Sequence, residues 1–128
     1  MTVTPAADLA SVAPFLSRAL PHDVAWPGTL AETVAGCHLF ELRRDGQIVG
    51  ALAARVDRFD SGTALFVTCA GAAPGANVLP DMLAWLEHQA RDVVRARQVQ
   101  CLTARPGLVR ALKRRGYRVG GYLMTREI

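Results

Sequence analysis

Few side chains in this sequence could move a proton during catalysis. Glu41 and Asp57 fall on neighbouring predicted strands, where a carboxylate could act as a general base through a water molecule. Tyr117 carries a phenol that could donate a proton. The carboxylates also fit solvent-facing strand positions, and the phenol also fits a core aromatic. Glu41, Asp57 and Tyr117 are therefore the candidate catalytic residues, each with a structural alternative.

The histidines and cysteines form no metal-binding or nucleophile motif. His22, His38 and His88 are far apart and have no partner at ligand spacing. The three cysteines are odd in number, widely separated and without a CxxC pair, which favours free, buried thiols over disulfides or zinc. Cys69, at the end of a predicted strand, is the one thiol near a predicted cleft. We predict no metal site and a reducing, cytoplasmic compartment.

Basic residues gather in the C-terminal part of the chain. From Arg91 to Arg126 there are ten Arg or Lys residues and one acid, although the net charge is only +4. Such a segment can meet nucleic acid, a phosphate-bearing ligand or an acidic protein face, or simply be solvated. No stacking aromatics alternate with these arginines, so nucleic acid is the weaker prediction. No apolar run is long enough to cross a bilayer, which predicts no membrane partner, and the first ten residues do not resemble a secretory signal.

Hydrophobic periodicity and turn residues predict the elements of the first seventy residues. The expected elements are a strand over 2–4, a helix over 9–20 that Pro14 kinks or divides, a short helix opened by a Thr29–Glu32 capping box, and strands over 38–44, 47–56 and 63–70. Asp45-Gly46 predicts a tight hairpin turn between the first two of these last strands. These three strands form an antiparallel meander.

The rest of the chain alternates helices and strands. The expected elements are a loop over 71–77, a helix over 79–93, a strand over 99–103, a helix from Arg105-Pro106 to Gly116, and a final strand over 117–128 with a bulge or bend at Gly120-Gly121. A meander followed by a crossover to a parallel strand gives an α+β fold with a mixed central sheet flanked by helices. At 128 residues we expect a single domain, 1–128.

This element order, with the closing stretch Thr103-Ala-Arg-Pro-Gly-Leu-Val-Arg-Ala-Leu-Lys-Arg-Arg-Gly116-Tyr117, resembles the GNAT (Gcn5-related N-acetyltransferase) superfamily over nearly the whole chain. The resemblance implies the acyl-CoA N-acyltransferase fold, with acetyl-CoA as the cofactor. It also implies that the helix starting near Leu79 receives the cofactor pyrophosphate at its N-terminus, where unpaired N–H groups favour an anion. The cofactor-binding residues implied in this way are Gly71, Gly75, Ala76, Asn77, Val78 and Arg105.

The sequence departs from the family's functional motifs. The pyrophosphate loop Q/R-x-x-G-x-G/A would place Ala72 at the Gln/Arg position, Gly75 at the first Gly and Asn77 at the second, so one of three positions matches. The family's proton-donating Tyr corresponds to Leu112, and the Asn that often opens the same helix corresponds to Arg105. No acid lies between residues 61 and 80, where the family often has a general base.

Two functions follow from this mixture. The chain is similar to small, degenerate GNAT-like proteins of tailed bacteriophages, of the internal virion protein type. That resemblance implies a structural or assembly protein that has lost catalysis, needs no cofactor and contacts other subunits of a virion or a homo-oligomer. The alternative is an acetyl-CoA-dependent N-acetyltransferase with an atypical pyrophosphate loop. A sheet edge, Trp26 or Trp85 could form a dimer contact.

Overall fold

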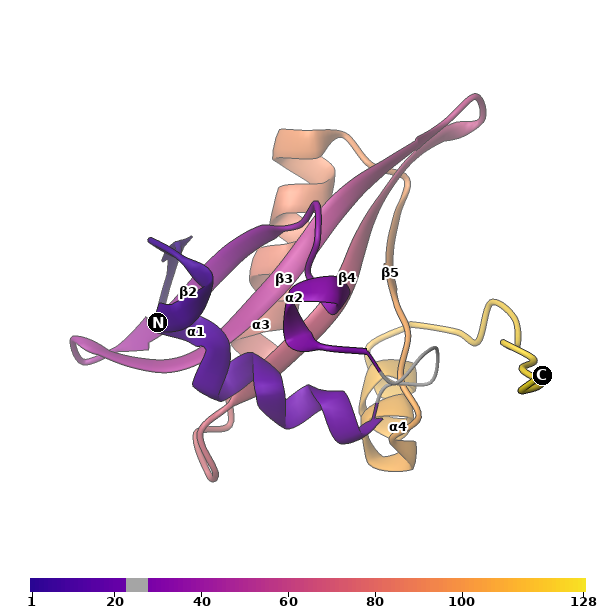
Figure 1. Ribbon diagram of the computed structural model, residues 1–128. Coiled ribbons are helices and arrows are strands. Elements are labelled where there is room, and N and C mark those ends of the chain that lie inside the picture. The colour runs from indigo at the N-terminus through magenta and orange to yellow at the C-terminus, as the bar shows by residue number, and fades with distance from the viewer. Residues whose placement is uncertain (23–27) are drawn as a thin grey trace.

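The computed structural model describes residues 1–22 and 28–128, which are built around a five-stranded sheet (Figure 1). The strands are β1 (Thr2–Pro5), β2 (His38–Arg44), β3 (Gln47–Phe59), β4 (Gly62–Ala72) and β5 (Gln98–Cys101), and they lie side by side in that order. The first four strands are antiparallel, whereas β5 runs parallel to β4. A parallel neighbour requires a crossover connection, and here a helix supplies it.

Helices cover both faces of this sheet. Helices α1 (Leu9–Leu16) and α2 (Leu30–Thr33) lie on one face, in front in Figure 1, and α3 (Leu79–His88) lies on the other. Helix α4 (Pro106–Arg114) follows β5 and contributes Leu112 to the α3 side of the core. The predicted α+β fold with a mixed sheet is confirmed.

The core is divided by the sheet into two hydrophobic clusters. Consecutive residues of β3 point to opposite faces, so Leu52 and Ala54 meet α3 while Ala51 and Ala53 meet α1. All four side chains are buried. The central strand is therefore apolar on both faces, as expected for a strand with helices on either side.

Two local signals produce the structures that the sequence predicts. Thr29 and Glu32 form the capping box of α2: the Glu32 N–H donates to the Thr29 hydroxyl at 3.2 Å and the Thr29 N–H donates to the Glu32 carboxylate at 3.4 Å. Asp45 and Gly46 both have positive φ, 53° and 78°, and join β2 to β3. That backbone geometry matches the twist of a hairpin.

Some predicted boundaries are wrong. The helix predicted over 9–20 is divided, because α1 ends at Leu16 and a 3₁₀ helix (Ser17–His22) follows, although the division comes three residues after Pro14. Strand β4 continues to Ala72, and so includes part of the predicted loop. The helix predicted over 79–93 is α-helical only to His88, and a π-helical turn (Gln89–Val94) follows.

The final predicted strand does not form. Residues 118–128 have no regular structure and run away from the sheet toward the C-terminus in Figure 1. A strand is stable only when its N–H and C=O groups meet a neighbour, and no described strand pairs with this segment. We refer to residues 118–128 as the tail.

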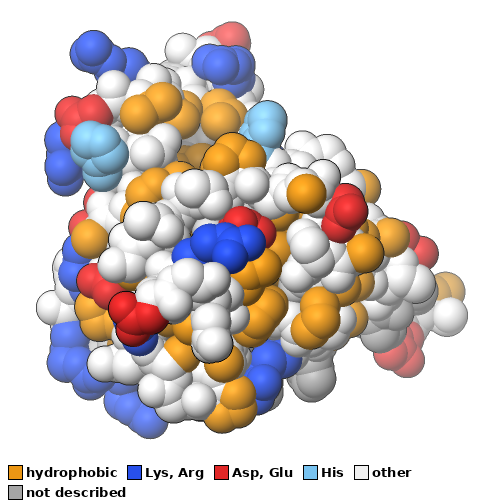
Figure 2. All heavy atoms as spheres, turned by 90° about the vertical axis from the view of Figure 1, so that its left-hand side faces the viewer, with side chains coloured by type: hydrophobic (Ala, Val, Ile, Leu, Met, Phe, Trp, Pro, Cys, Tyr) orange, Lys and Arg blue, Asp and Glu red, His pale blue; other side chains and the backbone are white. Residues whose placement is uncertain are grey.

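The edge at β1 and β2 carries a mixed surface. Figure 2 shows hydrophobic, basic and acidic side chains interspersed on this face.

Trp85 packs against Phe40, with ring centroids 4.8 Å apart and an interplanar angle of 61°, so it belongs to the core. Trp26, the other predicted contact, lies outside the described residues. In the described part of the chain, no helix has the length and apolar character needed to cross a membrane.

Candidate functional site

Strands β4 and β5 pair over only part of their length. Their last pair is Val67 with Cys101, whereas β4 continues to Ala72. Beyond Cys101 the chain leaves the ladder and leads into α4, which begins at Pro106. The sheet therefore opens between the two strands at the level of Thr68.

A β-bulge lies at the point where the sheet opens. Ala53 pairs with Cys69, but the next residue, Ala54, pairs with Val67, so Thr68 has no partner on β3. A bulge bends its strand and increases the local twist. The Thr68 hydroxyl lies 3.4 Å from both the Ala53 carbonyl oxygen and the Cys37 sulfur. The bulge therefore turns β4 away from β5 where the opening starts.

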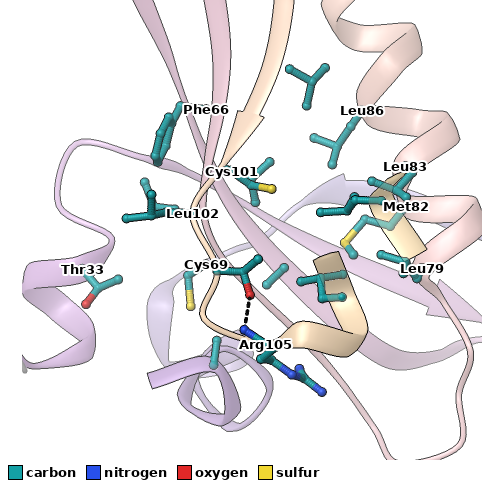
Figure 3. Close-up of a pocket in the computed structure, with 18 of the residues that line it drawn as sticks. Thr33, Phe66, Cys69, Leu79, Met82, Leu83, Leu86, Cys101, Leu102 and Arg105 are labelled. Atoms are coloured by element: carbon teal, nitrogen blue, oxygen red, sulfur yellow. Dashed lines mark hydrogen bonds between the residues drawn. The ribbon is translucent and has the colours of Figure 1, made fainter. Parts of the chain in front are cut away.

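The opening is a slot of about 420 Å³. Leu79, Met82, Leu83 and Leu86 of α3 line one side, as Figure 3 shows. Thr33 of α2 and Leu102 after β5 lie toward the opposite side. Because its lining comes from helices on both faces of the sheet, the slot passes between β4 and β5. Its size is within the range of small-molecule sites, about 300–1,000 Å³.

Few polar groups interrupt the apolar lining. Glu32 is the only acidic side chain that lines the slot among the described residues, and Arg55 and Arg105 are its only basic ones. Arg55 is held by Asp57, at 2.8 Å, and lies over the Phe66 ring at 4.6 Å. The hydrogen bond with Asp57 raises the pKa of Arg55, so the guanidinium stays charged.

The three candidate catalytic residues do not come together. Glu41 on β2 forms an ion pair with Arg43 at 2.7 Å and does not line the slot. Asp57 on β3 is paired with Arg55, and only the arginine lines the slot. Tyr117 does line it. The candidates are thus separated, and one of them remains at the site.

The Tyr117 hydroxyl is held by another group. It donates a hydrogen bond to Glu87 at 3.1 Å, and the Glu87 carboxylate is also bound by Arg115 at 2.8 Å. Burial, followed by the Glu87 charge, raises the pKa of Tyr117 far above its ordinary value. Loss of its proton is therefore strongly disfavoured, which opposes a role as general acid.

Most of the candidate cofactor residues lie outside the slot. Of Gly71, Gly75, Ala76, Asn77, Val78 and Arg105, only Arg105 lines it. Gly71 pairs with Ala51 inside the sheet, and a Cβ there would overlap the Phe15 carbonyl oxygen. This glycine therefore lets α1 approach β4, and its backbone is committed to the sheet.

The loop before α3 uses part of its own hydrogen-bonding capacity. The Ala73 N–H donates to the Val49 carbonyl at 2.9 Å, and the Ala76 N–H donates to the Ala73 carbonyl at 3.1 Å. Gly75 and Asn77 have positive φ, 76° and 49°, which shape the turn. Pro80 has no N–H, and Asp81 in the first turn of α3 is paired with Arg44 at 3.5 Å. These features oppose the binding of a pyrophosphate here.

The cysteines and histidines are placed as follows. Cys69 and Cys101 line the slot, and burial raises the pKa of Cys101. In the described part of the chain, the three cysteines form no disulfide with one another. His88 contacts Asp92 at 2.9 Å, an acidic neighbour that the sequence analysis overlooked. In the part of the chain that the structure describes, no three His, Cys, Asp or Glu side chains are grouped for a metal ion.

Glu32, Thr68 and Leu102 are site residues that the sequence analysis missed. Glu32 was predicted only as a helix cap, a role that it also fills. Glu32 is far from β5 in the sequence, so its place beside the slot becomes visible only in the folded chain. The Thr68 bulge leaves no local sequence signal, because a bulge is defined by pairing with another strand.

Solved structures have the same fold at low sequence identity. One is a possible acetyltransferase from Clostridium difficile 630, with a TM-score of 0.74 and 9% identity over 99% of this chain and 96% of that chain. Another is a predicted acetyltransferase with acetyl-CoA from Clostridium acetobutylicum, with a TM-score of 0.65 and 15% identity over 98% and 96%. A third is a transcriptional regulator from Bacillus halodurans C-125, with a TM-score of 0.72 and 14% identity over 99% of both chains.

Comparisons of sequence add nothing to this likeness. No protein-family model matches the chain, and no curated protein matches it. At these identities the shared architecture shows the fold alone, because one fold can carry many functions. The mixed five-stranded sheet with helices on both faces has the GNAT acyl-CoA N-acyltransferase fold.

Proposed function

We propose that this chain binds an acyl thioester of the coenzyme A class in the slot and transfers the acyl group to an amine. The observation that carries the proposal is the apolar opening between β4 and β5, which passes through the sheet at the Thr68 bulge. A slot of this shape can hold an extended acyl-pantetheine arm on one side and admit an amine from the other. The structural likeness to acetyltransferases supports this use of the slot.

The residues present fit one end of such a ligand better than the other. The slot walls suit the acyl-pantetheine arm, because most of the lining side chains are Leu, Val, Met, Phe or Ala. The loop before α3 suits the pyrophosphate poorly, since Pro80 removes a donor and the N–H groups of Ala73 and Ala76 already bond to backbone carbonyls. We therefore expect the arm to supply most of the affinity.

The chemistry of the proposed reaction requires little of the protein. The amine nitrogen bonds to the acyl carbonyl carbon, the carbon–sulfur bond breaks, and one proton passes overall from nitrogen to sulfur. Holding two reactants in line can supply several kcal/mol, about 7–11 in favourable cases. Glu32, the acidic side chain at the slot, is the group placed to accept the amine proton. Leu112 lines the slot and cannot protonate the sulfur, so we expect water to do so.

Calorimetric titration with acetyl-CoA and with S-acetylpantetheine tests this proposal. S-acetylpantetheine lacks the nucleotide and the pyrophosphate, so we expect it to bind within about tenfold of acetyl-CoA, a difference of about 1.4 kcal/mol. Leu102→Trp should abolish binding by filling the slot, since Leu102 lines it and is 48% exposed. Val93→Trp is the matched control, because Val93 is 62% exposed and does not line the slot.

Absence of heat with both ligands at millimolar concentration would contradict acyl-thioester binding. That result would favour the other prediction from the sequence, a chain that has lost catalysis and serves in an assembly, including a phage particle. A Leu102→Trp variant that binds as tightly as Val93→Trp would show that the slot is not where the ligand lies.

A further inference from the structure

Charged side chains gather at one of the two mouths of the slot. Glu32 and Thr33 of α2 and Arg55 of β3 line the slot. Ala53 packs on the α1 side of the sheet, so Arg55, two residues further along β3, is on that side too. Figure 3 shows Thr33, Phe66 and Leu102 on the side of the slot away from the α3 leucines. We call the mouth formed by these five residues, Glu32, Thr33, Arg55, Phe66 and Leu102, the α2 mouth.

Arg55 is held in one orientation while part of its guanidinium is left without a partner. Its Nε donates to Asp57 at 2.8 Å, and the guanidinium lies over the Phe66 ring at 4.6 Å. Arg55 and Phe66 are opposite each other in the β3–β4 register, so their side chains share a face. Among the described residues, neither terminal nitrogen of Arg55 has a hydrogen-bond partner, and the side chain is 44% exposed. Two such nitrogens in one plane match the two oxygens of a carboxylate.

The other basic side chain of the slot lacks this support. The backbone N–H of Arg105 donates to the Thr103 hydroxyl at 3.1 Å. In the described part of the chain, the Arg105 guanidinium has no hydrogen bond or ion pair to orient it. Fixing a free arginine side chain on a ligand costs conformational entropy, which a side chain already held in place does not lose again. Arg55 is therefore the better prepared of the two cations.

The α2 mouth also carries the opposite charge and apolar surface. Glu32 would attract an ammonium group, but Arg55 would repel a ligand whose only charge is positive. A ligand with both an ammonium and a carboxylate group is matched by both side chains, and this gives selectivity against simple amines. Phe66 and Leu102 add apolar surface, and Leu102 is 48% exposed. The mouth thus suits a small zwitterion with an apolar group.

We propose that the α2 mouth binds a free amino acid with an apolar side chain, its carboxylate on Arg55 and its ammonium group toward Glu32. The inference rests on the proposed acyl transfer for one point, that this amino acid is the acceptor. The ammonium would lose one proton to Glu32 and then to solvent. Its nitrogen would bond to the acyl carbon as the carbon–sulfur bond breaks, and its second proton would be balanced by protonation of the sulfur. The product would be an N-acyl amino acid and a thiol.

Calorimetric titration without acyl thioester tests the binding of the amino acid by itself. L-leucine is compared with L-leucinamide, which has nearly the same shape but no carboxylate. We expect L-leucine to bind about tenfold more tightly, as for loss of a hydrogen bond between charged groups. Arg55→Gln should remove this preference, and Arg55→Lys, which keeps the charge but not the planar fork, should retain part of it. Arg55 is partly exposed, so these variants should fold.

Arg58→Gln is the matched control, because it removes one positive charge from the same strand. Arg58 is exposed and does not line the slot, so the preference for L-leucine should remain. Absence of L-leucine binding at millimolar concentration would overturn the inference. It would also be overturned if L-leucinamide binds as tightly as L-leucine, or if Arg58→Gln loses the preference as Arg55→Gln does.

Steady-state kinetics with acetyl-CoA then tests the role of the amino acid as acceptor. The measured quantity is the ratio of kcat/KM for L-leucine to kcat/KM for 3-methylbutylamine, which is leucine without its carboxylate. Arg55→Gln should lower this ratio about tenfold, through the KM for L-leucine. The same two amines are used with each variant, so the difference in their intrinsic reactivity cancels.

Failure of the acyl transfer can be told from failure of this inference. Binding of L-leucine that depends on Arg55, in a protein that neither binds acetyl-CoA nor transfers its acetyl group, would contradict the proposed function and support the amino acid site. Acetyl transfer with the same ratio in the parent and in Arg55→Gln would support the proposed function and overturn the assignment of the acceptor.

Discussion

At the scale of single residues, the fold decides which acidic side chain can act at the slot. Glu41 and Asp57 each lie beside an arginine two residues away on the same strand, at 2.7 Å and 2.8 Å. Such pairs commit the carboxylates to structural roles. Glu32 reaches the slot from a helix of four residues, and its carboxylate accepts one long bond, 3.4 Å from the Thr29 N–H. It is the carboxylate most available to a ligand.

Glu32→Gln should therefore lower the rate of acyl transfer without abolishing acyl-thioester binding. A general base contributes about 10²–10⁴ in rate, and an exposed base is expected to contribute near the lower limit. Steady-state kinetics with a primary amine measures kcat and KM separately, and the loss should appear in kcat. Glu41→Gln is the matched control, because Glu41 does not line the slot. Equal losses in the two variants would contradict the role assigned to Glu32.

At the scale of elements, one cluster of polar groups joins α3 to the segment after α4. Glu87 of α3 accepts from Arg115 at 2.8 Å and 3.1 Å and from Tyr117 at 3.1 Å. The hydrogen bond with Arg115, with a smaller contribution from Tyr117, lowers the pKa of Glu87. A carboxyl group with a lowered folded-state pKa stabilises the fold above its unfolded pKa, and the stabilisation is lost as the pH falls through the folded-state value.

Glu87→Gln should thus destabilise the protein at pH 7 and have a shrinking effect as the pH drops below about 4. There the parent carboxyl takes up a proton first in the unfolded chain and then, at lower pH, in the folded protein. Denaturant unfolding at several pH values measures this difference. Asp92→Asn is the control, because Asp92 pairs with His88 while both side chains are more than half exposed. Its effect at pH 7 should be the smaller of the two. A pH-independent loss in Glu87→Gln would show that packing, rather than charge, is responsible.

The elements that the sequence predicted correctly are those with local causes. The Asp45-Gly46 turn and the Thr29–Glu32 capping box depend on residues within a few positions, and both form. The segment 117–128 has the composition of a strand but does not form one. A strand also needs a neighbouring strand to pair with, and the sequence of the segment does not show whether one is present. Pro14 lies in the second turn of α1, where it removes the bond that a backbone N–H would donate to the Ala10 carbonyl, and α1 ends two residues later at Leu16.

At the scale of the whole molecule, the slot could be predicted only in outline. The sequence places Cys69, at the end of a predicted strand, near a cleft, and Cys69 does line the slot. Which side chains line it depends on how far β5 extends and on the bulge at Thr68, both of which are set by pairing. The glycines of the predicted phosphate loop were interpreted as ligand-binding. Gly71 instead permits the approach of α1.

The contacts of Tyr117 mark where the folded domain ends. Tyr117 is tied to the domain by its N–H, which donates to the Leu112 carbonyl at 3.0 Å, and by its hydroxyl, which donates to Glu87. The tail after it is exposed. A chain that ends at Tyr117 should therefore unfold at the same temperature as the full chain. A chain that ends at Gly116 should lose about 1–3 kcal/mol, since a half-buried aromatic and its hydrogen bonds are removed.

Thermal unfolding of the three chains separates the contribution of Tyr117 from that of the tail. The Gly116 chain should melt about 4–10 °C below the other two. Equal melting temperatures of the Tyr117 chain and the full chain would show that the tail adds nothing to the stability of the domain. If the Tyr117 chain melts below the full chain, the tail packs on its own domain.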